Sequence, residues 1–245
     1  MKLIKPSHEI IACSGFWPLL KSDWLPQTAD GASKGMLQII ELAARNCYKS
    51  EDAITCDSAG PFVGKIANVF KHESVVEHAS VTVRFICDRG VTHELVRHRL
   101  AAYSQESTRY CNYSKSKFGG HCTFIIPPWI NIPEAEYTGE SLHGYLRNLG
   151  PGYDITRLWA ESMLGCEAYY IESLKCGCSA QQARALLPNS LKTEIIMTTN
   201  LRNWKHIFKR RCSSKAHPQM QEMMKPLLAE FQKYLPELFG DVSPE

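Results

Sequence analysis

The sequence predicts a single domain of the α+β class, because strand and helix signals follow one another without a repeat or a dividing linker. Residues 80–87 alternate apolar residues with small or polar ones, which is typical of a strand. Residues 34–48 carry apolar side chains at helical spacing, namely Met36, Ile39, Ile40, Leu42, Ala43 and Cys47. No GxGxxG or Walker-type glycine pattern is present, so a Rossmann-type dinucleotide site is not expected.

The other elements are expected from local signals in the same way. Strands are predicted at residues 10–13, 122–126 and 192–199, and helices at 62–71, 153–175, 179–187, from 201 onward and at 219–239. Residues 130–152 are rich in proline, glycine and charge, and this composition indicates a surface insertion. All 245 residues are expected to belong to one domain.

The composition is that of an ordinary globular protein, with 44% hydrophobic and 22% charged residues. A net charge of +3 is too small to argue for a nucleic-acid partner, although it permits anionic small molecules. The first 20 residues lack the apolar segment of a signal peptide, and no apolar run approaches the length of a membrane span. The ten cysteines are therefore expected to be reduced thiols in a cytoplasmic protein.

Residues 97–110 concentrate polar groups that suit phosphate and carbonyl oxygens, including three arginines and a histidine. Asp88 is expected to cap a helix that becomes regular from Val91. Glu94, Arg97 and His98 would share one face of that helix at its C-terminal end. Residues 101–109 are then expected to form a loop that returns Ser107 and Arg109 toward them.

Two other interpretations of this stretch remain to be weighed. A basic stretch is more often a surface patch or a non-specific nucleic-acid site than an active site. His93-Glu94 and His98 resemble a zinc-protease helix, but that motif needs histidines four residues apart. Here they are five apart, which places them about 140° apart around a helix. A metal site is therefore not expected.

The sequence Arg97-His98-Arg99, followed after seven residues by Ser107, resembles the signature of the flavin-dependent thymidylate synthases (the ThyX family). Arg109 and Tyr110 extend this similarity, and so does the segment His72-Glu73-Ser74 with Glu77-His78. The similarity continues in register from about Lys34 to Gln221. It implies a ThyX-like fold, with a central, mostly antiparallel sheet flanked by several helices.

The resemblance implies FAD as the cofactor, with Glu77 and His78 as structural support. The residues that it assigns to FAD are His72, Ser74, Arg97, His98, Arg99, Gln105, Asn200 and His206. The family builds its sites between the chains of a homotetramer. Arg97, His98 and Arg99 are therefore expected to reach the flavin across a subunit boundary.

The resemblance implies dUMP as the substrate. The residues that it assigns to dUMP are Glu94, Arg97, Gln105, Glu106, Ser107, Thr108, Arg109, Arg184 and Arg211. Arg109 and Arg184 are expected at the phosphate, because a guanidinium matches phosphate geometry better than an ammonium does. Arg211 matches the arginine that activates the uracil ring and is the expected catalytic residue.

Two of these positions depart from the usual family pattern. Many members carry glutamate two residues before the motif serine, where this chain has Gln105 followed by Glu106, and Glu94 stands where glutamine is frequent. Which of Gln105 and Glu106 contacts the nucleotide stays open. Ser107 is expected to donate a hydrogen bond rather than act as a nucleophile, because the sequence places no base and orienting group beside it.

The implied reaction is the reductive methylation of dUMP to dTMP in de novo dTMP biosynthesis. 5,10-Methylenetetrahydrofolate would donate the carbon, reduced FAD the hydride, and NADPH would re-reduce the flavin. Neither nucleic acid nor membrane is an expected partner. The alternative from another class is a non-enzymatic nucleotide or nucleic-acid binding protein that uses the same arginines, and a metal-dependent hydrolase ranks third.

Overall fold

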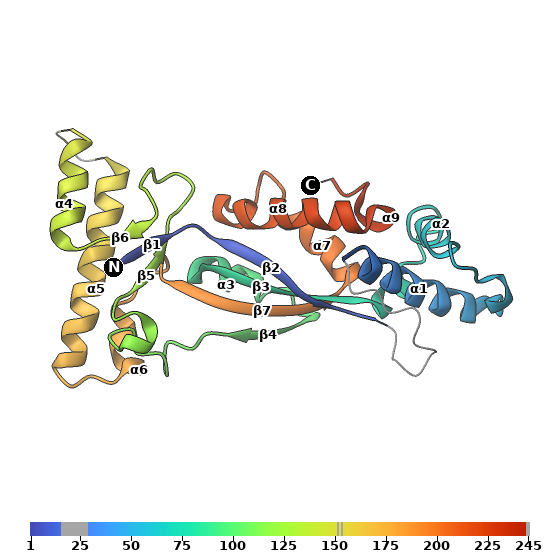
Figure 1. Ribbon diagram of the computed structural model, residues 1–245, viewed down its shortest axis with the longest axis horizontal. Coiled ribbons are helices and arrows are strands. Elements are labelled where there is room, and N and C mark those ends of the chain that lie inside the picture. Colours follow the sequence, from blue (N-terminus) through green and yellow to red (C-terminus); the bar gives the residue numbers. More distant parts are fainter. Residues whose placement is uncertain (16–28, 151, 153, 244–245) are drawn as a thin grey trace. The chain divides into compact units, whose positions relative to one another are not determined.

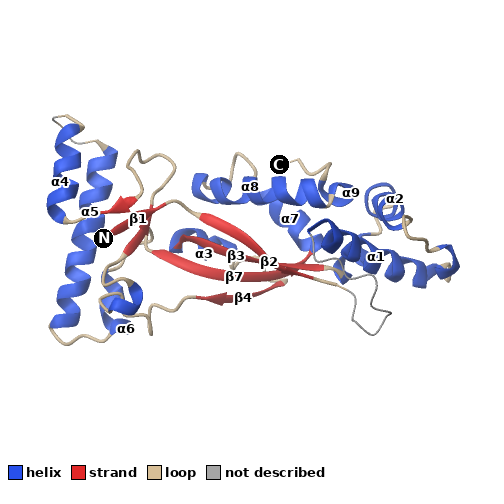
Figure 2. Ribbon diagram, viewed as in Figure 1, coloured by secondary structure: helices blue, strands red, loops and turns tan. Residues whose placement is uncertain are grey.

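The computed structural model describes residues 1–15, 29–150, 152 and 154–243, which form a mixture of helices and strands (Figures 1 and 2). The strands are β1 (Lys2–Ile4), β2 (Ser7–Cys13), β3 (Ser80–Asp88), β4 (Ala101–Gln105), β5 (Thr123–Ile125), β6 (Ala135–Glu136) and β7 (Lys192–Asn200). The helices are α1 (Ala29–Tyr48), α2 (Ala59–Gly64), α3 (Arg89–Leu95), α4 (Gly139–Asn148), α5 (Ile155–Lys175), α6 (Ala180–Ala183), α7 (Leu201–Arg211), α8 (Pro218–Tyr234) and α9 (Pro236–Phe239).

The strands form two sheets. The larger has the order β2-β3-β7-β4, and the smaller has the order β5-β1-β6. In the smaller sheet β1 runs parallel to β5 and antiparallel to β6, with Leu3 opposite both Phe124 and Ala135. The expected α+β class is confirmed by this combination.

The chain separates into two compact units. Unit 1 comprises Met1–Ser7, Phe85–Arg97 and Ser104–Ile195, and unit 2 comprises His8–Arg84, His98–Tyr103 and Ile196–Glu245. The chain passes from one unit to the other within β3, β4 and β7. Each unit has apolar residues that are fully removed from solvent.

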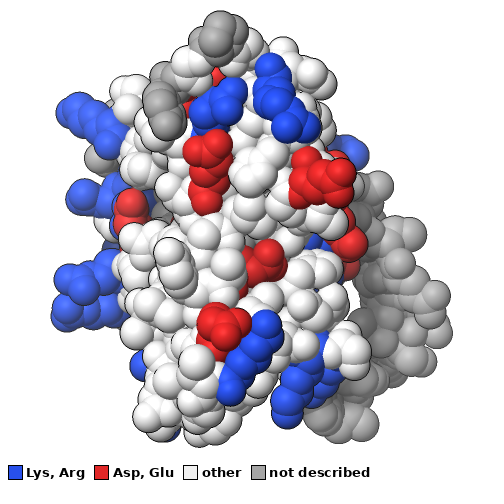
Figure 3. All heavy atoms as spheres, turned by 90° about the vertical axis from the view of Figure 1, so that its left-hand side faces the viewer, with Lys and Arg blue, Asp and Glu red and all other residues white. Residues whose placement is uncertain are grey.

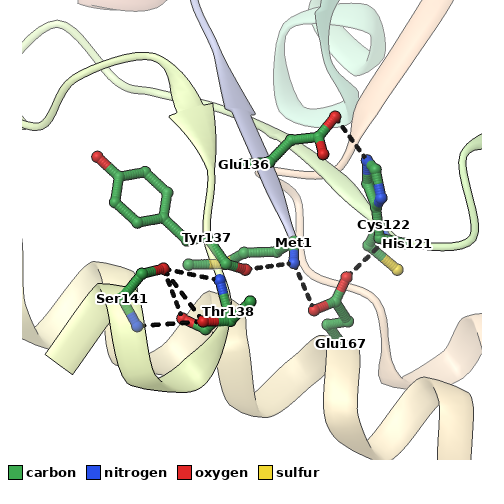
Figure 4. Close-up of polar contacts among 8 residues, drawn as sticks. All are labelled: Met1, His121, Cys122, Glu136, Tyr137, Thr138, Ser141 and Glu167. Atoms are coloured by element: carbon green, nitrogen blue, oxygen red, sulfur yellow. Dashed lines mark hydrogen bonds and ion pairs between the residues drawn. The ribbon is translucent and has the colours of Figure 1, made fainter.

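In unit 1 the small sheet packs with α4 and α5, and Leu3, Phe124, Leu142 and Tyr170 are fully buried there. The carboxylate of Glu167, on α5, is buried among these elements (Figure 4). It accepts a hydrogen bond from the Cys122 backbone N–H (2.8 Å) and forms an ion pair with the Met1 amino group (2.8 Å). A buried carboxylate with two partners avoids the cost of an unpaired charge, and Glu167 thereby joins α5 to β1 and to the start of β5.

The side of unit 1 that carries α4 and α5 has a mixed surface. Acidic and basic side chains are interspersed there and leave uncharged areas between them (Figure 3). Apolar side chains are exposed along α5, namely Ile155, Leu158 and Tyr169. Nucleic-acid-binding proteins instead gather lysine and arginine side chains on one face.

The core of unit 2 is built on aromatic residues of the three C-terminal helices. Trp204 and Phe208 of α7 pack against Phe231 of α8, and Phe208 also packs against Phe239 of α9, with ring centroids 5.0–5.9 Å apart. The Trp204 indole N–H donates to the carbonyl of Val81 (3.2 Å), so α7 is fixed directly to β3. Such rings bury a large apolar area and usually pair at their edges.

Several expected elements are confirmed, including the strands at 80–87 and 192–199 and the helix at 34–48. Asp88 caps α3 as expected, and its carboxylate accepts from the backbone N–H of Val91 (2.7 Å). Tyr153, the first residue of the helix predicted at 153–175, lies outside the described part of the chain.

Other expectations were wrong in detail. Residues 101–105 form β4 rather than a loop, with Ala101, Tyr103 and Gln105 half-buried on one side. The helix expected at 219–239 divides at Leu235, whose backbone is not helical because Pro236 follows it. α3 ends at Leu95, so Arg97 and His98 lie beyond the helix.

The segment 130–152 also contains more regular structure than its composition indicates. α4 begins with a capping box in which Thr138 and Ser141 satisfy each other's backbone N–H groups. Leu142 and Leu146 are fully buried against the core of unit 1. Among the described helices, none is both long enough and apolar enough to cross a membrane.

Candidate functional site

In unit 1, the residues after β4 form a tight turn that presents a serine and an arginine. The carbonyl of Ser107 accepts hydrogen bonds from the backbone N–H groups of Tyr110 (3.1 Å) and Cys111 (2.9 Å). The Ser107 hydroxyl accepts from the backbone N–H of Arg109 (3.3 Å). We call residues 107–111 the serine–arginine turn.

The end of α6 brings a second arginine to this turn. Arg184 donates from Nη1 to the hydroxyl of Thr108 (3.5 Å), and Arg109 donates from Nε to Oε1 of Gln181 (3.4 Å). α6 begins with a capping box between Ser179 and Gln182. The structure thus brings Ser107, Thr108, Arg109 and Arg184 together. Sequence reasoning missed Gln181.

Gln105 and Glu106 have different surroundings. The Gln105 amide donates to the hydroxyls of Thr92 (3.0 Å) and Thr193 (3.2 Å). Glu106 accepts from the Tyr113 hydroxyl (2.7 Å) and pairs with the Lys192 ammonium (2.9 Å). Both carboxylate oxygens of Glu106 are therefore engaged inside the protein. Glu94 is half-buried, and Arg97 is exposed.

In unit 2, a histidine and an arginine from the predicted site are in direct contact. Arg211, in the last turn of α7, donates from Nε to Nε2 of His98 (2.9 Å). The His98 ring also meets the ring of His206 edge-on, with centroids 6.1 Å apart. The Tyr103 hydroxyl donates to the His98 carbonyl (2.9 Å), which fixes the backbone at this point. Arg99 is exposed.

The electrostatics of His98 follow from this packing. Burial lowers the pKa of His98 to about 4, and the neighbouring charges of Arg211, His206 and Arg210 act in the same direction. His98 is therefore neutral at pH 7. Because its Nε2 accepts the hydrogen bond from Arg211, the ring proton lies on Nδ1. Burial likewise raises the pKa of Tyr103 to about 12, so its phenol remains a donor.

This lowered pKa predicts a pH dependence of stability. Below pH 6.5 the unfolded chain protonates His98, whereas the folded chain does so only near pH 4. The free energy of unfolding should therefore fall as the pH drops through this window, by at most about 3 kcal/mol. Urea unfolding at several pH values should show a shallower slope for His98→Gln than for the wild type. His143→Gln, at an exposed histidine, is the control, and equal slopes for the wild type and His98→Gln would refute the assignment.

Asn200 has a structural role at the start of α7. Its side chain accepts from the backbone N–H of Asn203 (2.8 Å) and so caps the helix. Asn203, which the sequence did not single out, donates to the hydroxyl of Thr199 (2.9 Å) and to the carbonyl of Leu100 (3.3 Å). These bonds connect α7 to the chain that follows His98.

His72 and Ser74 line a pocket of about 360 Å³ in unit 2, together with Tyr48, Cys47 and Arg202. The Tyr48 hydroxyl is hydrogen-bonded to Nδ1 of His72 (3.0 Å). Lys71, directly before His72, has a φ of 58°, which is uncommon for a residue other than glycine. Such a conformation costs free energy and often marks a functional position.

Arg202 is a further residue of this pocket that the sequence interpretation missed. It pairs with Glu73 (3.5 Å) and with Glu77, which was expected to serve as structural support. The hydrogen bond with Glu77 is the main cause that raises the pKa of Arg202. Desolvation lowers the pKa by a smaller amount, and the negative charges of both glutamates raise it again. The signal for Arg202 in the sequence was its position two residues after Asn200, which the resemblance assigns to FAD. Among the described residues, no three metal-ligating side chains lie close enough together to hold a metal ion.

The chain is similar to known proteins of one family. The family model described as "Thymidylate synthase complementing protein" matches residues 31–237. The chain is 31% identical over 252 residues to a flavin-dependent thymidylate synthase of Corynebacterium efficiens, covering 99% of this chain and 92% of the relative. It is 32% identical over 225 residues to that of Mycolicibacterium vanbaalenii, covering 87% and 80%.

A crystal structure of thymidylate synthase X (ThyX) from Helicobacter pylori with FAD and dUMP has a similar fold. The TM-score is 0.61 at 23% identity, covering 82% of this chain and 94% of that one. A second ThyX structure from the same organism, also with FAD and dUMP, gives 0.62 at 24% identity. The expected ThyX-like fold is thereby confirmed. On the extent of the family match and of the similarity to the curated relatives, the chain belongs to the family of the flavin-dependent thymidylate synthases.

Proposed function

We propose that this protein converts dUMP to dTMP with FAD as cofactor, 5,10-methylenetetrahydrofolate as carbon donor and NADPH as reductant of the flavin. The observation that carries the proposal is the convergence of Arg109 and Arg184 on the serine–arginine turn, in a chain of this family. The similar Helicobacter pylori structures, whose folds resemble this one, hold FAD and dUMP.

The phosphate of dUMP binds at the serine–arginine turn in this proposal. Arg109 and Arg184 provide two guanidinium groups, and Ser107 and Thr108 provide hydroxyl groups that form additional hydrogen bonds with phosphate oxygens. Hydrogen bonds from charged donors to phosphate are about twice as strong as neutral ones. The contacts with Gln181 and Thr108 fix both arginines before the nucleotide arrives, which reduces the entropy lost on binding.

Arg211 acts on the uracil ring in this proposal. Methylation at C5 requires the ring to become nucleophilic, and a guanidinium beside N3 and its neighbouring carbonyl stabilises the negative charge that develops. His98 orients that guanidinium through its neutral Nε2. A protonated His98 would instead place a second positive charge beside Arg211 and lose the acceptor.

The pocket at His72 fits part of FAD. Its donors are the Ser74 hydroxyl, the His72 imidazole and the Arg202 guanidinium, and Tyr48 adds an aromatic ring. These groups suit an anionic dinucleotide with flat rings. A volume of 360 Å³ lies at the small end of the range for ligand sites, about 300–1,000 Å³, so the pocket takes one portion of the cofactor. Reduced FAD, when bound, supplies the hydride for the methyl group.

His72, Ser74, Arg97, His98, Arg99, Gln105, Asn200 and His206 are the proposed FAD contacts. Glu94, Arg97, Gln105, Glu106, Ser107, Thr108, Arg109, Arg184 and Arg211 are the proposed positions around dUMP. We propose that the chain works in the cytoplasm as one domain and assembles as a homotetramer with sites between subunits. The exposed Ile155, Leu158 and Tyr169 on α5 are apolar side chains of the kind that such an assembly buries.

A visible absorption spectrum of the purified protein tests this function first. We expect flavin bands that bleach when NADPH is added anaerobically, and tritium release from 5-tritiated dUMP when methylenetetrahydrofolate is present. A protein that binds no flavin after incubation with excess FAD would instead favour a non-enzymatic nucleotide-binding protein. Light scattering on the same sample measures the assembly.

A further inference from the structure

The two ends of the serine–arginine turn are joined by a side-chain hydrogen bond. Glu106 precedes the turn and Tyr113 follows it, and the Tyr113 hydroxyl donates to Oε1 of Glu106 (2.7 Å). The turn between them contains Ser107 and Arg109. A bond that closes a loop at its base restricts the conformations open to its tip.

The Glu106 carboxylate is also ion-paired with β7. Lys192, the first residue of β7, lies 2.9 Å from Oε2 of Glu106 and 2.6 Å from Oε1 of Glu194. The Lys192 and Glu106 side chains are mostly buried, at 19% and 15% exposure. Burial alone would lower the pKa of Lys192, but hydrogen bonds with Glu194 and Glu106 raise it, so the ammonium remains charged. Removing one partner of an ion pair that is sheltered from water leaves an unpaired buried charge, which is strongly destabilising.

Tyr113 is anchored in the core of unit 1. Its side chain packs against Phe118 and Tyr170, with ring centroids 6.0 Å apart in both cases, and its backbone N–H donates to the Tyr170 hydroxyl (3.3 Å). Burial raises the pKa of the Tyr113 phenol, and the adjacent negative charge of Glu106 raises it further. Tyr113 therefore remains a proton donor at neutral pH.

The backbone at Glu106 is fixed as well. Its N–H donates to the carbonyl of Glu194 (2.8 Å), so the sheet contact between β4 and β7 continues to the first residue before the turn. One end of the turn is thereby attached to β7 and the other to the aromatic core under α5. Both attachments meet at the Glu106 carboxylate.

We propose that Glu106, Lys192 and Tyr113 are positioning residues, which set the serine–arginine turn so that Ser107 and Arg109 receive the nucleotide phosphate. This inference rests on the proposed function and changes one part of it, because Glu106 then acts behind the binding surface rather than on the nucleotide. Lys192 has a second effect. Its positive charge offsets the Glu106 carboxylate, which would otherwise repel a phosphate at the neighbouring arginine.

Calorimetric titration of the FAD-loaded protein with dUMP tests the inference. Lys192→Met leaves the Glu106 carboxylate sheltered and without its cation, and we expect the dissociation constant for dUMP to rise about tenfold. Glu106→Gln keeps an acceptor for Tyr113 and should weaken binding only about threefold or less. The double variant Glu106→Gln/Lys192→Met removes the sheltered charge at Glu106 and leaves only the Glu194 carboxylate, which is 40% exposed, without its cation. Binding should therefore recover to within about threefold of the wild type.

Tyr113→Phe is the second, milder probe, because it removes one hydroxyl and keeps the packed ring. We expect it to raise the dissociation constant for dUMP about threefold while the affinity for FAD stays unchanged. Lys175→Met is the matched control, since it breaks the exposed pair between Lys175 and Glu172 in the same unit. Thermal unfolding of each variant shows whether stability has changed separately from affinity.

The outcomes separate the inference from the function on which it depends. Unchanged dUMP affinity in both Lys192→Met and Tyr113→Phe would overturn the inference and leave the function intact. A large loss in Glu106→Gln that Lys192→Met does not relieve would show that Glu106 contacts the nucleotide directly. A wild-type protein that binds FAD but no dUMP would overturn both.

Discussion

Replacing Arg211 with alanine is expected to reduce thymidylate formation by about 10²–10³-fold, the usual cost of removing one donor that stabilises charge in a transition state. Arg211 is the last residue of α7, and its guanidinium is oriented by the hydrogen bond to His98. The loss should fall mainly on kcat, because the charge that Arg211 stabilises develops during the reaction. Tritium release from 5-tritiated dUMP is the direct measurement.

Arg210 provides the control for this experiment. It belongs to the same turn of α7, carries the same charge and is exposed. Arg210→Ala should therefore retain most of the activity. Comparable losses in Arg210→Ala and Arg211→Ala would mean that the basic end of α7 acts as a general positive field, and the specific assignment of Arg211 would fall.

The second large effect is expected at the serine–arginine turn. Arg109→Ala and Arg184→Ala should each raise the KM for dUMP by about tenfold to a hundredfold, since a charge-assisted hydrogen bond to phosphate contributes about 1.5–3 kcal/mol. The nucleoside deoxyuridine lacks the phosphate. Its weak binding should be the same in the wild type and in both variants.

Lys115→Ala is the control for these two substitutions. Lys115 is exposed in the loop that follows the turn, and its side chain should not affect dUMP binding. A variant of Arg109 or Arg184 that loses affinity for deoxyuridine as strongly as for dUMP would contradict the assignment of these arginines to the phosphate. Initial-rate kinetics with both ligands measure the two effects together.

The elements with strong local signals could be predicted from the sequence. Residues 80–87 alternate in polarity, and Asp88 was predicted as the cap of α3. β4 could not be predicted in this way, because Ala101, Ala102 and Ser104 have weak strand preferences. That strand depends on pairing with β7, about ninety residues later in the chain.

Some residues of the candidate site could be suggested from the sequence, and others could not. Arg109, His98 and Arg211 could be proposed as site residues from the sequence, because they match positions of the family that the chain resembles. Lys192 could not be found, since its contact with Glu106 joins residues 86 positions apart and neither residue type is unusual in a strand or loop. Gln181 could not be predicted either, because its contact is with Arg109, which lies 72 positions away in the sequence. Contacts of this kind depend on the fold and leave no local pattern.

The chain passes several times between its two units, and this affects how the protein folds. Each unit is assembled from three separate segments, and β3 and β7 both begin in one unit and end in the other. No single cut of the chain therefore separates one whole unit from the other. Both units also depend on strand pairings between residues that lie far apart in the sequence. The chain loses conformational entropy to bring these residues together before their contacts stabilise it, and this slows folding. We expect slow refolding and one cooperative unfolding transition, with neither unit surviving the loss of the other.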